Sequence, residues 1–231
     1  MALRLKARGT SLCYKNKQIK PHSKITALAK PQFWGMETLQ NTNPALILID
    51  IQQGFDNIAY WGGQRNNPDA EVNARKLLDY WRANKLPLFH IQHCSVNPNS
   101  LLAEGNPGNA HKEIVKPLPG EAVIKKSINS SFIGTNLQQQ LDAAGIDTIV
   151  IAGLTTEHCV STTARMAGNL GYYTFVVADA TAAFAKTGIK GEHYNAETIH
   201  LTALAQINNE FATVLNTDEV LNALKKNDDF L

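Results

Sequence analysis

Short runs of apolar, often β-branched residues recur along the chain from residue 45 onward. Six such runs lie at 45–49, 87–91, 122–124, 148–152, 173–178 and 211–215. They are almost continuously apolar, a pattern typical of strands buried on both faces of a parallel sheet. Between them, stretches of helical length lie at 70–85, 136–144, 157–170, 195–209 and 217–225. The alternation predicts an α/β fold with a doubly wound, mainly parallel six-stranded sheet sandwiched by helices.

One connection is unusually long for a compact domain. Residues 94–120 separate the second apolar run from the third and are rich in proline, glycine and asparagine. Such a long connection is usually functional, often as a lid or an interface arm. The alternative is a surface loop without a specific role.

The N-terminal region differs in charge from the rest of the chain. Residues 1–35 contain eight of the 22 Lys and Arg residues and no acid, so the remainder is mildly acidic. We expect 1–42 to be a basic, disordered extension and 43–231 to form a single domain. A mitochondrial-type presequence, or a start codon placed upstream of Met36, are alternatives for the basic segment. A secretory signal is disfavoured because the segment is only weakly apolar.

Composition excludes several classes of protein. No run approaches the roughly 18 apolar residues of a membrane helix, so no membrane association is expected. The mildly acidic body has no basic stripe, which argues against nucleic-acid binding. The chain has three cysteines, Cys13, Cys94 and Cys159, which are widely spaced and form no C-x-x-C motif. This pattern disfavours a disulfide framework or a zinc knuckle and favours a reducing, cytoplasmic location.

Three reactive side chains follow three of the predicted strands. Asp50 closes the first, Lys126 lies just after the third, and Cys159 follows the fourth. Each alone has an ordinary explanation: a turn cap, a solvated charge or a small buried residue. Ligands of open α/β sheets, however, bind at the carboxyl ends of the strands. The fold can therefore bring together an acid, a cation and a thiol.

The segment around Cys159 favours a nucleophile. Gly153 and the N-cap types Thr155 and Thr156 precede a helix that we expect to start near Glu157. In the first turn, free N–H groups and the helix dipole stabilise a thiolate and can donate to an oxyanion. A nearby ammonium would lower the pKa of the thiol further, and a carboxylate could accept its proton.

Four segments resemble a known family. IDIQQGF, VIKKSINSSFIGT, GLTTEHCV and AETIHLTALAQINNEFATVLNT are similar, in order and spacing, to isochorismatase-like cysteine hydrolases, and the likeness spans about 44–223. It is closest to the streptothricin-hydrolase-type branch. The resemblance implies an Asp–Lys–Cys triad, a cis peptide bond upstream of the cysteine and a covalent acyl- or carbamoyl-enzyme. By position, Leu154–Thr155 would be the cis bond, and the N–H groups of Thr155 and Cys159 would form the oxyanion hole.

The resemblance also selects further site residues. Its lysine lies four residues before the first serine of Ser-Ala-Phe, here Ser130-Ser131-Phe132, which identifies Lys126 rather than Lys125. Phe55 either stacks on a planar substrate or is a core aromatic, and His158 is a packing or neighbouring residue rather than the general base. The expected substrate-binding set comprises Gln52, Phe55, Trp61, Asn129, Thr156 and His158.

No metal or other cofactor is expected. Nicotinamidases of this superfamily carry an Asp-x-His motif after the second strand, where this chain has His90-Ile-Gln-His93. Two histidines three apart on a strand face opposite sides, so they cannot bind one ion together.

These features favour a metal-independent hydrolase of small C–N bonds in amides, ureides or lactams. Cys159 would form a thioester-type intermediate, Asp50 would be the general acid and base, and Lys126 would assist. The alternatives are a vinyl-ether hydrolase of the isochorismatase type, a catalytically silent binding protein and a redox sensor. The resemblance further implies a homo-oligomer, a dimer or tetramer, acting on a small molecule.

Overall fold

The computed structural model describes residues 39–40 and 42–225. The extension predicted over 1–42, with its alternative start at Met36, falls almost entirely outside these described residues.

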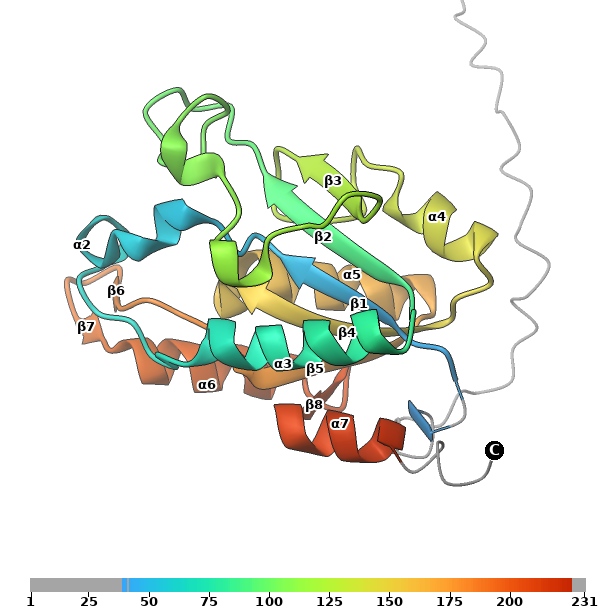
Figure 1. Cartoon of the computed structure of the whole chain (residues 1–231). Helices are drawn as coiled ribbons and strands as arrows, with labels where there is room; N and C mark the ends of the chain where they lie inside the picture. Colours follow the sequence, from blue (N-terminus) through green and yellow to red (C-terminus); the bar gives the residue numbers. More distant parts are fainter. Residues whose placement is uncertain (1–38, 41, 226–231) are drawn as a thin grey trace, which may run out of the picture. The chain divides into compact units, whose positions relative to one another are not determined.

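A sheet of six parallel strands forms the centre of the described chain (Figure 1). The strands are β1 (Ala45–Ile49), β2 (Leu88–His93), β3 (Ala122–Lys126), β4 (Thr148–Leu154), β5 (Tyr173–Ala182) and β8 (Thr213–Leu215). They lie in the order β3-β2-β1-β4-β5-β8, and every neighbouring pair is parallel. The predicted class, sheet and number of strands are therefore confirmed.

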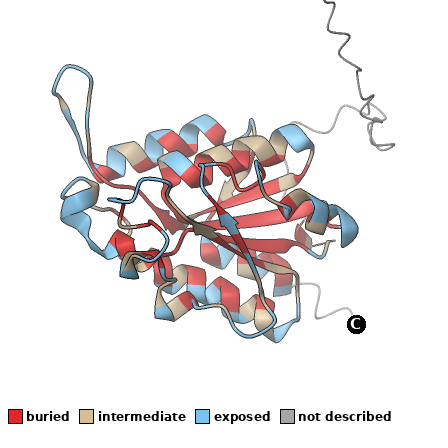
Figure 2. Cartoon of the chain, turned by 90° about the horizontal axis from the view of Figure 1, so that it is seen from above, coloured by how far each residue is buried: buried red, intermediate tan, exposed pale blue. Residues whose placement is uncertain are grey.

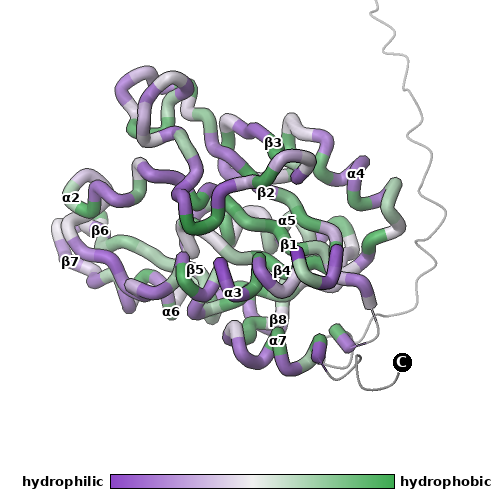
Figure 3. Tube along the Cα trace, in the orientation of Figure 1, coloured by the Kyte–Doolittle hydropathy of each residue, from purple (hydrophilic) through white to green (hydrophobic). Residues whose placement is uncertain are grey.

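β1 explains why the apolar runs do not alternate. It pairs with β2 on one side and β4 on the other, and all of its residues are buried. Ile47 and Ile49 contribute to the core on one face, whereas Leu46 and Leu48 contribute to the core on the other. The hydrophobic stretches of the chain follow these central strands, while the helices are mixed in hydropathy (Figure 3).

Helices cover both faces of the sheet, and their inward sides are buried (Figure 2). On one face lie α4 (Leu137–Ala143), α5 (Ser161–Leu170) and α6 (Ala196–Ile207), and on the other α3 (Ala70–Ala83) and α7 (Thr217–Lys225). In α3, the helical spacing of Leu77, Leu78 and Trp81 places all three in the core, where each contributes roughly 1.5–3 kcal/mol. No helix among the described residues is both long and apolar enough to cross a membrane.

One predicted helix begins differently. The sequence indicates an α-helix over 157–170, but the chain first forms a π-helical turn, η4 (Thr156–Val160), and only then α5. The wider turn is seen in the hydrogen bond from Val160 N to Thr155 O, at 3.2 Å. Such turns within helices often occur at functional sites.

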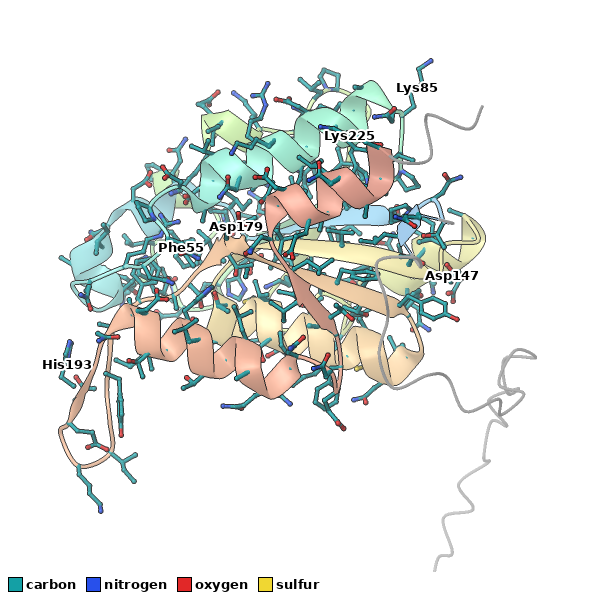
Figure 4. All side chains as sticks on the ribbon, turned by 90° about the horizontal axis from the view of Figure 1, so that it is seen from below. Phe55, Lys85, Asp147, Asp179, His193 and Lys225 are labelled. Carbon is teal, nitrogen blue, oxygen red and sulfur yellow. The ribbon has the colours of Figure 1, made fainter. Side chains whose placement is uncertain are left out.

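Several short elements carry no periodic signal, because three or four residues do not complete a hydrophobic repeat. They are η1 (Gln53–Asp56), α2 (Ile58–Trp61), η2 (Pro107–Asn109), η3 (Glu113–Val115) and a hairpin of β6 (Lys186–Thr187) with β7 (His193–Tyr194). The hairpin, which carries His193, extends away from the helices (Figure 4). The 3₁₀ turns η2 and η3 interrupt the long 94–120 connection.

Gly153 in β4 allows β1 and β4 to approach closely. Its φ is +127°, and a Cβ there would overlap the carbonyl oxygen of Ile49. Gly145 also has a positive φ, +66°, but space for a methyl group.

We expect Gly153→Ala to lower the free energy of unfolding by about 4 kcal/mol or more, and Gly145→Ala by only about 1 kcal/mol. Urea unfolding followed by circular dichroism tests this, and equal losses in the two variants would contradict it.

Candidate active site

Four side chains converge at the carboxyl end of the sheet. Asp50 follows β1, His93 ends β2 and Lys126 ends β3. Cys159 lies in the η4 turn after β4. From β1 the chain runs outward to β2 and β3, then returns to β4 on the opposite side of β1. Open α/β sheets bind ligands outside the strand ends at such a reversal.

The ammonium group of Lys126 is the centre of this cluster. Its Nζ lies 2.6 Å from Asp50 Oδ2, 3.1 Å from Ile128 O, and 3.2 Å from both His93 Nδ1 and Cys159 Sγ. The side chains of Lys126 and Asp50 are 0% and 1% exposed. Because burying a charge costs several kcal/mol, each depends on the other as its partner.

The two adjacent lysines face opposite sides of β3. Lys126 points into the cluster, whereas the Lys125 side chain is more than half exposed and forms an ion pair with Glu104. Lys126, the residue that the family register selects, is therefore the one that reaches Asp50 and Cys159.

Asp50 leaves one carboxylate oxygen available. Its φ of 52° is left-handed, and its N–H donates to Ile91 O at 3.0 Å. Oδ2 accepts from Lys126, but Oδ1 is buried and has no hydrogen-bond partner among the described residues. The carboxylate lies within 4.8 Å of Cys159 Sγ. The unpaired Oδ1 is therefore a buried acceptor near the thiol, able to take its proton on closer approach or through one water molecule.

The environment of Cys159 corrects one expectation. Burial raises the pKa of the thiol well above its ordinary value, the Asp50 carboxylate raises it further, and Lys126 lowers it in part. The sequence predicted a lowered pKa from a helix N-terminus. The thiol instead lies in a π-helical turn packed against the core, with Cys159 only 9% exposed. A base must therefore accept its proton when it reacts.

His93 belongs to the cluster, although no role was predicted for it from the sequence. His90 and His93 do face opposite sides of β2: His90 Nε2 lies 2.9 Å from Glu121 Oε2, while His93 Nδ1 lies beside Lys126. Burial, and then the charge of Lys126, lower the pKa of His93. The available signal was its position at the end of β2, the same edge at which Asp50 and Lys126 lie.

The turn between β4 and α5 carries the expected oxyanion residues. The peptide bond between Leu154 and Thr155 is cis, at the position that the family resemblance implies. Thr155 is buried, and its Oγ1 has no hydrogen-bond partner in the described chain. Thr156 was expected to bind substrate, but it has no exposed surface and its Oγ1 lies 2.9 Å from His200 Nδ1 in α6. The hydrogen bond between Thr156 and His200 thus connects the turn to α6, a role that the sequence did not indicate for His200.

Gln52 also differs from its expected role. It is fully buried, and its Nε2 donates to the carbonyl oxygens of His93 at 3.0 Å and Asn109 at 2.7 Å. Its Oε1 accepts from His93 N at 2.9 Å. The amide is therefore used to fix β2 and the 94–120 loop, and it does not face a ligand.

The aromatic candidates form a small cluster of their own. Phe55 is 4% exposed, and its ring centroid lies 4.6 Å from that of Trp61 and 6.1 Å from that of Phe184. Trp61 also donates to Gly54 O at 2.8 Å. Phe55 lies at the opposite end of the sheet from Asp147, which precedes β4 (Figure 4). The burial of Phe55 favours its interpretation as a core aromatic.

Asn129 and His158 are the exposed candidates. The Asn129 Oδ1 lies 4.0 Å from Cys159 Sγ, so Asn129 borders the thiol from the solvent side. The side chain of His158 is 55% exposed, and its Nδ1 lies 3.9 Å from Glu157 Oε1. Of the two, Asn129 is the one in contact with the reactive atom.

A metal ion fits this arrangement poorly. Asp50, His93 and Cys159 each offer a ligand atom within 4.8 Å of the others, and such residue types bind metals. The ammonium of Lys126, however, contacts all three and already supplies a positive charge there. A second cation would be repelled by it. That the site works without metal stays a prediction.

Replacing Lys126 by Met would retain most of the side-chain volume but leave the Asp50 charge buried without its partner. We expect Lys126→Met to lower the free energy of unfolding at pH 7 by about 3–5 kcal/mol. The matched control is Lys125→Met, which removes an exposed ion pair and should cost no more than about 1 kcal/mol. Urea unfolding measures both; a Lys126 variant as stable as the Lys125 variant would contradict the central role of this ammonium.

Two similar proteins extend over nearly the whole described domain. The isochorismatase family protein YrdC of Bacillus subtilis is 50% identical over 178 residues, which cover 77% of this chain and 94% of YrdC. The crystal structure of a hydrolase of the isochorismatase family from Chromobacterium violaceum is 43% identical, with a TM-score of 0.78. That match covers 80% of this chain and 96% of the other.

Relatives whose names state an activity are less similar. Maleamate amidohydrolase of Pseudomonas putida is 31% identical over 62% of this chain and 74% of its own length. Streptothricin hydrolase of Streptomyces noursei is 32% identical over 61% of this chain and 50% of its own length. The family model of the isochorismatase domain matches residues 44–219. The chain therefore belongs to the isochorismatase family of hydrolases.

Proposed function

We propose that this protein hydrolyses small C–N bonds, in amides, ureides or lactams, without a metal ion and through a thioester on Cys159. The observation that carries the proposal is the position of Lys126 Nζ, 2.6 Å from the Asp50 carboxylate and 3.2 Å from the Cys159 sulfur. A thiol and a carboxylate that both contact one ammonium are groups that acyl transfer to a cysteine can use.

Acylation would begin with proton transfer from the Cys159 thiol to Oδ1 of Asp50, the oxygen without a partner. The sulfur attacks the carbonyl carbon, and the N–H groups of Thr155 and Cys159 donate to the developing oxyanion. The C–N bond then breaks, and Asp50 returns the proton to the leaving nitrogen. Lys126 balances the negative charge on sulfur and carboxylate throughout.

Deacylation would use the same carboxylate. Asp50 takes a proton from water, the resulting hydroxide attacks the thioester carbon, and the C–S bond breaks. The proton returns to sulfur, which regenerates the thiol and releases the acid. The raised pKa of the resting thiol supports this cycle, because it makes a base necessary for acylation and favours return of the proton to sulfur at the end.

The substrate class rests on the thiol and on the relatives. Vinyl-ether hydrolysis needs no sulfur nucleophile, so the contact between Cys159 and Lys126 favours C–N cleavage. One relative bears the name maleamate amidohydrolase, which supports an amide substrate, and a second bears the name streptothricin hydrolase, which supports hydrolysis of a small molecule.

The nucleophile and the substrate class can be tested together. Incubation with a panel of primary amides, ureides and lactams, followed by intact-mass measurement, should detect an acyl adduct on Cys159. We expect Cys159→Ala to lose about 10³-fold or more in turnover while unfolding like the wild type.

The paired lysine variants supply the control for this assay. Lys126→Ala should slow acylation by about 10²-fold or more, whereas Lys125→Ala should stay within about twofold because that side chain faces solvent. Full activity of Cys159→Ala would overturn the mechanism. Cleavage of a vinyl ether by that variant would instead support the isochorismatase-type alternative.

A further inference from the structure

The Lys126 ammonium has one more acceptor than it has hydrogens. An ammonium group carries three hydrogens. Its Nζ lies at 3.2 Å or less from four acceptor atoms: Asp50 Oδ2, Ile128 O, His93 Nδ1 and Cys159 Sγ. At any moment one of these atoms receives no hydrogen from Lys126. Which one that is depends on the protonation state of the acceptors.

Two of the acceptors are constant. Asp50 Oδ2 makes the shortest contact, 2.6 Å, and is still an acceptor when Oδ1 carries the thiol proton, and the Ile128 carbonyl oxygen accepts in every state. The third hydrogen is therefore shared between His93 and Cys159. A thiol is a weak acceptor, whereas a thiolate is a strong one.

His93 is fixed where it can accept this hydrogen. Its backbone N–H donates to Gln52 Oε1 at 2.9 Å. Its carbonyl oxygen accepts from Gln52 Nε2 at 3.0 Å and from Asn109 Nδ2 at 2.8 Å. Burial lowers the pKa of His93, which favours the neutral ring, and Nδ1 accepts from the ammonium in the tautomer whose hydrogen is on Nε2. The charged or titratable groups that face the His93 ring are Lys126, Asp50 and Cys159.

We propose that His93 is a positioning residue that holds the third hydrogen of Lys126 while Cys159 is a thiol and yields it to sulfur when the thiolate forms. The proposal rests on the proposed function only in taking Cys159 as the nucleophile. No proton leaves the ammonium: one N–H···N hydrogen bond is exchanged for one N–H···S hydrogen bond. The thiol proton itself goes to Asp50, as in acylation.

This competition has a chemical consequence in the absence of substrate. Each thiolate must draw a hydrogen away from His93, so the histidine opposes ionisation of the resting thiol. Cys159 is thereby kept less reactive toward alkylating and oxidising agents, even though an ammonium lies 3.2 Å from the sulfur. A bound substrate that places its carbonyl carbon against the sulfur overcomes the competition.

Two variants of similar polarity separate this role from a structural one. In His93→Asn, Oδ1 takes nearly the place of Nδ1 and can still accept from Lys126. In His93→Gln, the amide lies near the position of Nε2 and cannot. Alkylation of Cys159 by iodoacetamide at pH 8, quantified on its peptide by mass spectrometry, should be about fivefold faster in His93→Gln. His93→Asn should stay within about twofold of the wild type.

A Lys126→Met background provides the second comparison, because there the two His93 variants should alkylate equally. An unchanged or slower rate in His93→Gln would overturn the proposal, as would equal acceleration in both variants. Thermal unfolding verifies that each variant is folded. Alkylation needs no substrate, so this result is independent of the amide assay: failure of the proposed function would appear as a missing acyl adduct in the wild type.

Discussion

The buried ammonium of Lys126 is the interaction on which the site depends. A cation with no exposed surface is stable only if acceptors surround it, and β1, β2 and the turn after β4 each supply one. Because these elements are consecutive neighbours in the sheet, the requirement is met by strand order alone. The edge strand β3 contributes the cation itself and one backbone acceptor just beyond it. The contacts that stabilise the buried Lys126 ammonium are thus the same contacts that hold Asp50, His93 and Cys159 close together.

The protonation of Cys159 depends on burial and on the charges of Asp50 and Lys126. Burial favours the thiol over the thiolate, and Lys126 opposes that tendency only in part. In the resting site the sulfur is therefore a thiol that contacts the ammonium, rather than a thiolate in a preformed ion pair with it. Asp50 has one oxygen committed to Lys126 and one unpaired, which suits a group that takes up and returns a proton.

Much of this could be predicted from the sequence, because parallel strands buried on both faces leave a strong local pattern. The strands and four of the five helices were predicted with ends within about two residues, apart from the later end of β5. The choice of Lys126 over Lys125 followed from the family register, although Lys126 ends β3 and does not follow it. What could not be predicted depends on distant partners. His93 acquires its role from Gln52, 41 residues away in the chain, and from Lys126, 33 residues away.

The errors share a physical origin. The turn at Thr156 has the composition of a helix start, and nothing local distinguishes a π-helical turn from an α-helical one. The direction of the Cys159 pKa was wrong because local reasoning counts the helix terminus but not the burial that the rest of the domain imposes. The roles of individual site residues remain predictions until variants are measured.

Gly153 helps to set the separation between Asp50 and the turn that carries Cys159. At that position β4 lies against the β1 carbonyl of Ile49 with no side chain between them. Asp50 and the turn carrying Cys159 leave from two backbones in direct contact, so their separation is set by main-chain geometry. Substitutions in the helices, loops and hairpin can then reshape what enters the site without moving acid and nucleophile apart. The spacing between Asp50 and Cys159 could in this way be retained while the residues around the two side chains change.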